Sequence, residues 1–74
     1  MNRTVQAALN RTLARRLKAL RKSRGMKVAR LAKVAGVSPN TIYSWERGGN
    51  APTTAHLYIL KDAFNCTWGD LLGD

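Results

Sequence analysis

A stretch near the middle of the chain, KVARLAKVAGVSPNTIYSWERG, constrains the fold more than any other feature of the sequence. It runs from Lys27 to Gly48 and predicts two short helices joined by a tight turn. Gly36 stands where a left-handed residue usually ends a helix. Ser38 can cap the second helix with its hydroxyl, and Pro39 suits the first helical position, where its missing N–H group costs nothing. The sequence therefore predicts a helix, a short turn and a second helix.

The apolar side chains of this stretch recur at helical spacing, so each expected helix has one apolar face. The first face consists of Val28, Leu31, Ala32 and Ala35. The second consists of Ile42 and Trp45, and Val37 can fill the corner between the two helices. We expect Trp45 to belong to a core and not to a ligand site.

A longer helix is expected before this stretch, ending near Arg24. Its apolar face is formed by Leu9, Leu13, Leu17 and Leu20. The start is open, because either Thr4 or Asn10 can cap the helix and the residues up to about Thr4 are expected to form a loose arm. We expect residues 1–8 to be a basic N-terminal arm or an extension of this helix, and residues 9–74 to be the domain proper.

Two further helices are expected after the central stretch. Thr53 can cap a helix over about 54–64. We expect its inward face to consist of Leu57, Leu60, Ala63 and Phe64. Thr67 can cap a last short helix, and an acid three positions on, Asp70, completes a box-like cap. We expect Leu71, Leu72 and Trp68 to close the core. Strand patterns are absent, so the predicted fold is all-α, a compact bundle of five short helices.

Composition excludes several classes of function. A chain of 74 residues forms one small domain. The single cysteine, Cys66, forms no internal disulfide and no zinc site, and we expect it to be a small buried apolar group. No apolar run approaches the roughly 20 residues of a membrane span. Without paired carboxylates, an activated nucleophile or a glycine-rich phosphate loop, the sequence predicts no enzyme and no cofactor, metal or small-molecule ligand site.

The charge of the chain is strongly positive and unevenly distributed. The net charge is +9, and eight basic residues with no acid precede Gly25. After the central stretch the sequence contains one basic residue, Lys61, and three acids, Asp62, Asp70 and Asp74. Such polarity favours a polyanion at one end of the domain, although a solvated basic face or a membrane surface would also fit charge alone. Together with a two-helix motif that can enter the major groove, it favours double-stranded DNA.

Several groups of residues, spread from Leu13 to Leu72, carry a family resemblance. They are Leu17 and Arg21, Leu31-Ala32, Gly36-Val37-Ser38, Ile42, Trp45-Glu46-Arg47-Gly48, Pro52, and the closing run Phe64 to Leu72. In this order the chain resembles the lambda-repressor/Cro-like (XRE-type) family of helix-turn-helix DNA-binding domains. The resemblance implies a sequence-specific transcriptional regulator of bacterial or phage origin, cytoplasmic and associated with the nucleoid. It implies a repressor that binds a pseudo-palindromic operator as a homodimer.

The resemblance also implies roles for particular residues. Arg21 and Glu46 match positions that form a partly buried ion pair, the alternative being a weak surface pair. The base-reading residues would be Ser38, Pro39, Asn40, Thr41, Tyr43 and Ser44, with the family's usual positions on Pro39, Asn40 and Ser44. The phosphate contacts would be Arg16, Lys27, Arg30, Arg47, Gly49 and Asn50. For Lys18, Lys33 and Lys61 a free surface charge is the expected state.

Two departures and one rival hypothesis remain. Val28 stands where many relatives have a phosphate-binding glutamine, and Pro39 replaces a frequent polar base-reader. The operator sequences of those relatives therefore cannot be assigned to this chain. The rival is a protein-interaction module, such as an antitoxin or an accessory subunit with the same fold. The expected dimer surface is the C-terminal end, with Trp68, Leu71 and Leu72. His56 has no partner pattern and is expected to be solvated.

Overall fold

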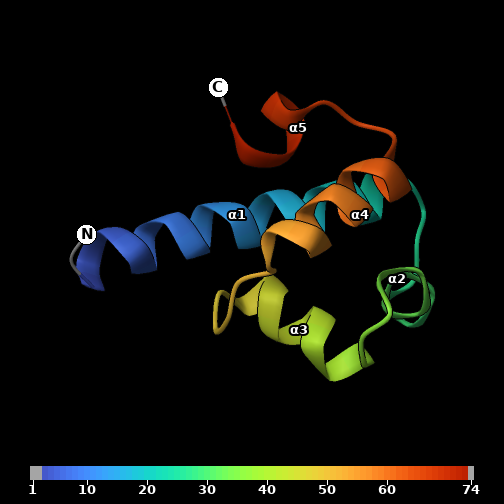
Figure 1. Cartoon of the computed structure of the whole chain (residues 1–74), viewed down its shortest axis with the longest axis horizontal. Coiled ribbons are helices and arrows are strands. Elements are labelled where there is room, and N and C mark those ends of the chain that lie inside the picture. Colours follow the sequence, from blue (N-terminus) through green and yellow to red (C-terminus); the bar gives the residue numbers. More distant parts are fainter. Residues whose placement is uncertain (1–2, 74) are drawn as a thin grey trace.

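The longest element of the fold is a single helix that spans the molecule. The computed structural model describes residues 3–73, so expectations for residues 1, 2 and 74 lie outside it. Helix α1 (Arg3–Ser23) has 21 residues, which corresponds to about 31 Å of helix. The largest extent of the molecule is 33 Å. The other helices therefore pack along or around α1 (Figure 1).

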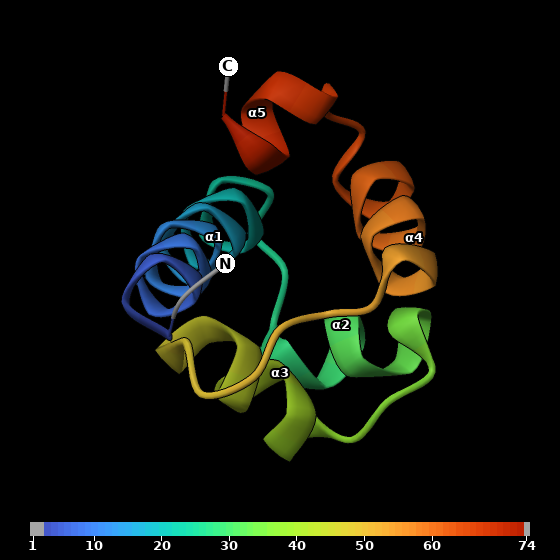
Figure 2. The same ribbon diagram turned by 60° about the vertical axis from the view of Figure 1, so that its left-hand side comes forward.

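Four shorter helices follow: α2 (Val28–Ala35), α3 (Pro39–Arg47), α4 (Thr54–Phe64) and α5 (Trp68–Leu72). The α3 helix runs beside α1 in the opposite direction, and α5 covers the other side of α1 (Figure 1). Helices α2 and α4 complete the ring of helices around the core (Figure 2). The described residues contain no strand. The predicted all-α fold of five helices is confirmed.

The central motif forms through the local signals that the sequence carries. Gly36 ends α2 in the left-handed conformation, at φ 72°. The Ser38 side chain then accepts a hydrogen bond of 3.3 Å from the Thr41 backbone N–H, and Pro39 occupies the first turn of α3. Lys27 precedes α2 without a side-chain cap. The turn is thus fixed by contacts within a few residues.

One core joins all five helices. Its most deeply buried large side chains are Leu17, Leu31, Ile42, Leu60, Phe64 and Leu71, one or two from each helix. Val37 and Met26 pack at its edge in the two corners beside α2. The predicted inward faces of α2, α3 and α4 are confirmed, with Leu57 and Ala63 half-buried against the core. Because side chains of α3 belong to this core, the packing of the core fixes the orientation of α3 relative to the other helices.

The N-terminal start of α1 differs from one sequence expectation. The helix begins at Arg3, so Thr4 is neither part of a loose arm nor the cap, and Asn10 lies inside the helix. No break separates residues 3–8 from residues 9–23. The segment is helical because it contains good helix formers and neither glycine nor proline, so α1 propagates through it.

The C-terminal end differs as well. Leu71 is fully buried, which excludes it from a dimer surface, whereas Leu72 is 47% exposed and does not close the core. Trp68 is 36% exposed. Its ring meets Tyr58 edge-on at 5.0 Å, and the Lys61 ammonium lies 5.5 Å from its centre. A helix of five residues has room for one inward position, and Leu71 occupies it.

Candidate nucleic-acid interface

Helix α3 has an inward face and an outward face. Ile42 and Trp45 are buried in the core, at 1% and 4% exposure. The side chains on the opposite face are exposed: Pro39, Asn40, Tyr43 and Arg47. The spacing of these residues at one, three and four positions keeps them on one side of the helix. The structure therefore presents a polar, partly aromatic and basic face to any partner of α3.

An ion pair holds α3 on α1. Arg21 Nε donates to Glu46 Oε2 at 2.7 Å, and Arg21 Nη2 donates to Glu46 Oε1 at 3.0 Å. The third donor, Arg21 Nη1, bonds the Met26 carbonyl at 3.0 Å. The side chains are only 12% and 6% exposed. The hydrogen bonds that Arg21 donates to Glu46 raise the pKa of Arg21, and their bidentate geometry fixes the relative position of the two helices.

A second attachment joins α3 to α4. The Trp45 and His56 rings lie 5.1 Å apart, tilted by 51°. His56 Nδ1 accepts a hydrogen bond of 3.4 Å from the Thr53 backbone N–H and lies 3.0 Å from the Thr53 hydroxyl. The Thr53 side chain in turn accepts from the His56 N–H, so the two residues form a reciprocal cap of α4. The expectation that His56 is merely solvated is wrong.

Three of the predicted base-reading residues at the start and edge of α3 have local partners. The Ser38 and Thr41 hydroxyls lie 3.0 Å apart, and Ser38 also caps the helix. Ser44 is half-buried. Its hydroxyl lies against Gly49, where an added Cβ would come within 3.2 Å of Ser44 Oγ. The structure thus places Pro39, Asn40 and Tyr43 more freely than Ser38, Thr41 and Ser44.

The predicted phosphate contacts form two groups at the borders of the motif. Lys27 and Arg30 are exposed at the first turn of α2. The other group consists of Arg47, Gly49 and Asn50, exposed at the end of α3 and in the following loop. The Gly49 N–H, however, donates to the Ser44 carbonyl at 3.0 Å. This amide is therefore already satisfied within the fold and is less available to an outside partner than the exposed basic side chains of each group.

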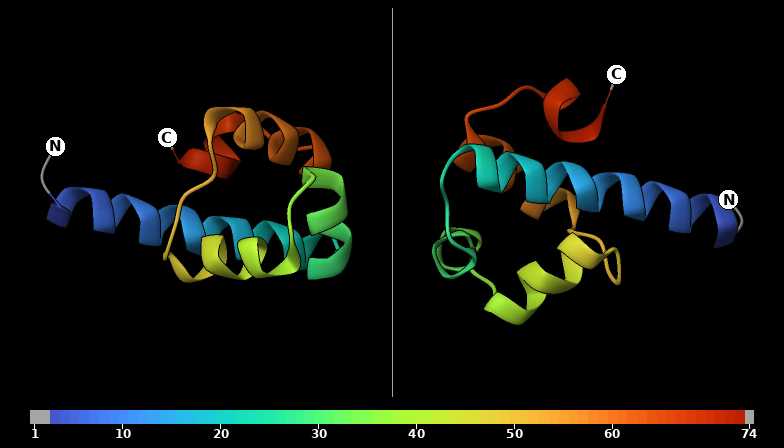
Figure 3. Two further views of the ribbon diagram at one scale, coloured as in Figure 1. Left: turned by 60° about the horizontal axis from the view of Figure 1, so that its bottom comes forward. Right: turned by 180° about the vertical axis from the view of Figure 1, so that it is seen from behind.

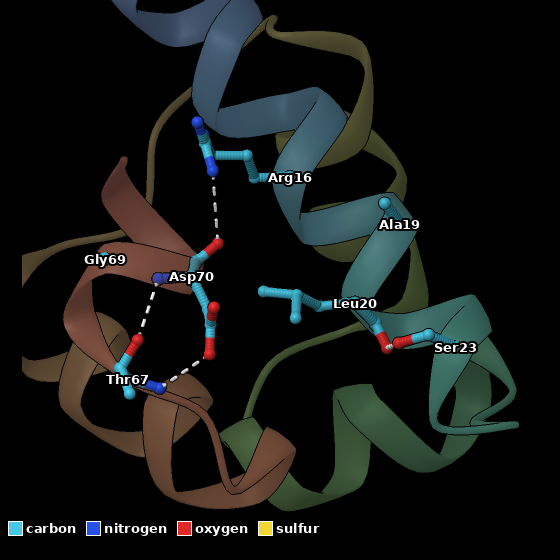
Figure 4. A pocket seen from close by; sticks show the side chains of 7 residues that line it. All are labelled: Arg16, Ala19, Leu20, Ser23, Thr67, Gly69 and Asp70. Carbon is cyan, nitrogen blue, oxygen red and sulfur yellow. Dashed lines mark hydrogen bonds between the residues drawn. The ribbon is translucent and has the colours of Figure 1, made fainter. Parts of the chain in front are cut away.

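Arg16 lies apart from these groups. Its guanidinium donates to the Asp70 carbonyl at 3.5 Å, across an open cleft between α1 and α5 (Figure 4). Asp70 also accepts from the Thr67 N–H at 3.1 Å, which lowers the pKa of its carboxyl group. The α5 helix covers the side of α1 that is remote from α3 (Figure 1). The structure therefore does not bring Arg16 to the surface formed around α3.

A different arginine of α1 lies beside α3, one that the sequence analysis did not single out. A Cβ at Gly48 would stand 3.6 Å from both Cα and Cγ of Arg11. Gly48 has φ 77° and ends α3. Arg11 thus stands next to the loop that carries Gly49 and Asn50. The signal that could have found it is the spacing of Arg11, Arg15, Lys18 and Lys22, which repeats at helical intervals.

The structure offers little for other chemistry within residues 3–73. No three side chains of the His, Cys, Asp and Glu types gather there as a metal site. Cys66, expected to be buried, is half-buried against the core, and burial raises the pKa of its thiol, which disfavours the reactive thiolate. In the same range, no helix is long and apolar enough to cross a membrane.

Comparisons with known proteins bear on the fold. A family model described as helix-turn-helix matches residues 17–71. The crystal structure of an HTH_3 family transcriptional regulator from Vibrio cholerae superposes with a TM-score of 0.79, at 30% sequence identity. The match covers 89% of this chain and 37% of that one, so the chain spans little more than a third of the length of its solved relative. A comparison with curated proteins gave no match.

Proposed function

The chain belongs to the helix-turn-helix family, and from this premise we propose that it is a sequence-specific transcriptional regulator that binds double-stranded DNA. The observation that carries the proposal is the outward face of α3. It is polar and exposed, it is held from behind by the Arg21–Glu46 pair and by Trp45, and the chain carries a net charge of +9. A rigid polar helix in a positive field is suited to the major groove.

In the proposed mode of binding, two kinds of contact have separate tasks. The basic side chains at the two borders, Lys27 and Arg30 on one side and Arg47 on the other, bind phosphates and set the register on the duplex. Residues of α3 then read base edges. Asn40 can make a bidentate contact to adenine, and the Pro39 ring can touch a thymine methyl group. We assign these tasks to the domain of residues 9–74.

We further propose that the protein acts as a homodimeric repressor. Two copies related by a two-fold axis would place their α3 helices on half-sites about 34–36 Å apart, which is one turn of DNA, and so recognise a pseudo-palindrome. Repression would follow from occlusion of a promoter. Such a regulator works at the bacterial nucleoid, in the cytoplasm. The polar face of α3 favours this function over the protein-interaction module, which would bury an apolar helix face.

Selection from a pool of random double-stranded DNA at near-physiological salt tests the proposal, because non-specific binding is weak there. The expected result is enrichment of an inverted repeat whose half-site spacing matches one helical turn. An enriched single half-site would contradict the homodimer but keep the DNA-binding function. A pool without any enrichment would reject sequence-specific binding and favour the protein-interaction module.

The role of Asn40 gives a sharper prediction. Asn40→Ala is expected to weaken binding to the selected site by about 1–3 kcal/mol and to leave non-specific binding nearly unchanged, because the lost contact is to a base edge. Fluorescence anisotropy with the selected duplex and a scrambled duplex measures both affinities.

Lys27→Ala is the matched control for this experiment. Because Lys27 is assigned to a phosphate, its removal should weaken both complexes alike. If Asn40→Ala weakened binding to the two duplexes equally, Asn40 would be a backbone contact and not a base reader.

A further inference from the structure

Four basic side chains form a continuous stripe along α1, which we call the α1 stripe: Arg11, Arg15, Lys18 and Lys22. The successive steps of four, three and four residues keep them on one side of the helix. All four residues are exposed. Over the eleven steps from Arg11 to Lys22 the helix rises by about 16 Å. The stripe is therefore a row of positive charge and not a scatter of single cations.

The charges of the α1 stripe are not neutralised within the fold. Among residues 3–73, Arg21 and Glu46 form an ion pair. None of the four stripe side chains has an ion pair or a side-chain hydrogen bond within the same residues. The other described acids, Asp62 and Asp70, belong to α4 and α5. Four like charges in one row repel each other, so an anionic partner would relieve a repulsion that the fold leaves in place.

The α1 stripe borders the outward face of α3. Helices α1 and α3 lie side by side and antiparallel (Figure 3). At one end Arg11 stands against Gly48, the residue that ends α3. Further along, Arg21 bonds Glu46, and Tyr43 lies near enough to contribute to the rise in the pKa of Arg21. Lys18 lies three positions before Arg21 and Lys22 directly follows it, and both are exposed, so the basic row runs along α1 beside the residues that join α1 to α3.

Resting on the proposed function, we infer that the α1 stripe binds the phosphates of the DNA strand that borders the groove occupied by α3. Phosphates follow one another along the strand at the edge of a groove, so a row of cations about 16 Å long can contact more than one of them. The arginines supply forked donors and the lysines point charges, both suited to phosphate oxygens. This assignment replaces the expectation that Lys18 is a free surface charge.

The test compares two double variants that remove the same amount of charge. Arg15→Gln/Lys18→Gln neutralises the middle of the stripe, and Lys33→Gln/Lys61→Gln neutralises two cations on α2 and α4. Glutamine keeps the helix propensity close to that of arginine and lysine. The affinity of each variant for a labelled mixed-sequence duplex is measured between about 50 and 200 mM salt, the range over which phosphate contacts change affinity steeply. Circular dichroism confirms that each variant is folded.

The expected result is that the stripe variant reduces the slope of log affinity against log salt by about 1.8, since each phosphate contact contributes about 0.9. The Lys33/Lys61 variant should keep the parent slope. A stripe variant with the parent slope, or equal losses in both variants, would overturn the inference and leave the proposed function standing. A parent chain that shows no salt-dependent binding to the duplex would refute the proposed function itself, and the stripe with it.

Discussion

Glu46→Ala is expected to lower the free energy of unfolding by about 3–5 kcal/mol, because it leaves the Arg21 guanidinium largely buried without a counter-charge. The side chain of Arg21 is 12% exposed and makes two of its three hydrogen bonds to Glu46. The loss would be a large share of the stability of a domain of this size. Urea unfolding of the parent and the variant, followed by circular dichroism, measures it.

A paired replacement separates the burial of a charge from the geometry of the site. In Arg21→Met/Glu46→Leu both charges are removed and apolar volume is kept, so the stability should return close to that of the parent. Specific DNA binding should not return fully, since the bidentate bonds that orient α3 are absent. A loss below about 1 kcal/mol in Glu46→Ala would instead mean that the pair behaves as a surface salt bridge.

Trp45→Ala is expected to have a comparable effect on stability, about 3–5 kcal/mol, for a different reason. The indole is 4% exposed and fills the space between α3 and α4, where it contacts the His56 ring. Its removal would leave a cavity in the core between these helices. Thermal unfolding should show a fall in Tm of well over 10 °C, since about 1 kcal/mol corresponds to 4–8 °C in a domain of this size.

Trp68→Ala is the matched control, because the chain contains a second tryptophan outside the core. Trp68 is 36% exposed and contacts Tyr58 and Lys61 at the surface. Its removal should cost far less than that of Trp45. Equal losses for the two variants would show that tryptophan size, and not the position behind α3, determines the effect.

The middle of the fold could be predicted closely, since its boundaries are set by neighbours in sequence. Helices α3 and α4 begin directly after their caps, Ser38 and Thr53. They end at the left-handed residues Gly48 and Asn65. Each of these signals acts over three or four residues, through one hydrogen bond or one left-handed residue. Such contacts need no knowledge of the tertiary structure, and this is why the central motif was predictable.

The two ends of the chain were predicted less well because their signals are weak. At the N-terminus, Thr4 and Asn10 are both plausible caps, yet the segment between them continues the helix without using either. At the C-terminus, a helix of five residues contains too little sequence for periodicity to decide which of Trp68, Leu71 and Leu72 turns inward.

The candidate site shows the same division. The exposed face of α3 follows from the helical repeat alone. Which residues of α1 lie beside α3 cannot be predicted in this way. Arg11 and Arg16 are both arginines of α1 and differ only in the side of the helix that each occupies. The contact of His56 with Trp45 likewise depends on how α4 packs across α3, which no local pattern encodes.

The separation of α3 into an anchored face and an outward face has a consequence for how such a protein can evolve. Ile42, Trp45 and Glu46 determine that the domain folds, whereas Pro39, Asn40 and Tyr43 are exposed and add little to the core. Substitutions at exposed positions of this kind usually change stability by less than about 0.5 kcal/mol. If α3 reads DNA as proposed, lineages can therefore exchange one target sequence for another in single mutational steps, without passing through unfolded intermediates.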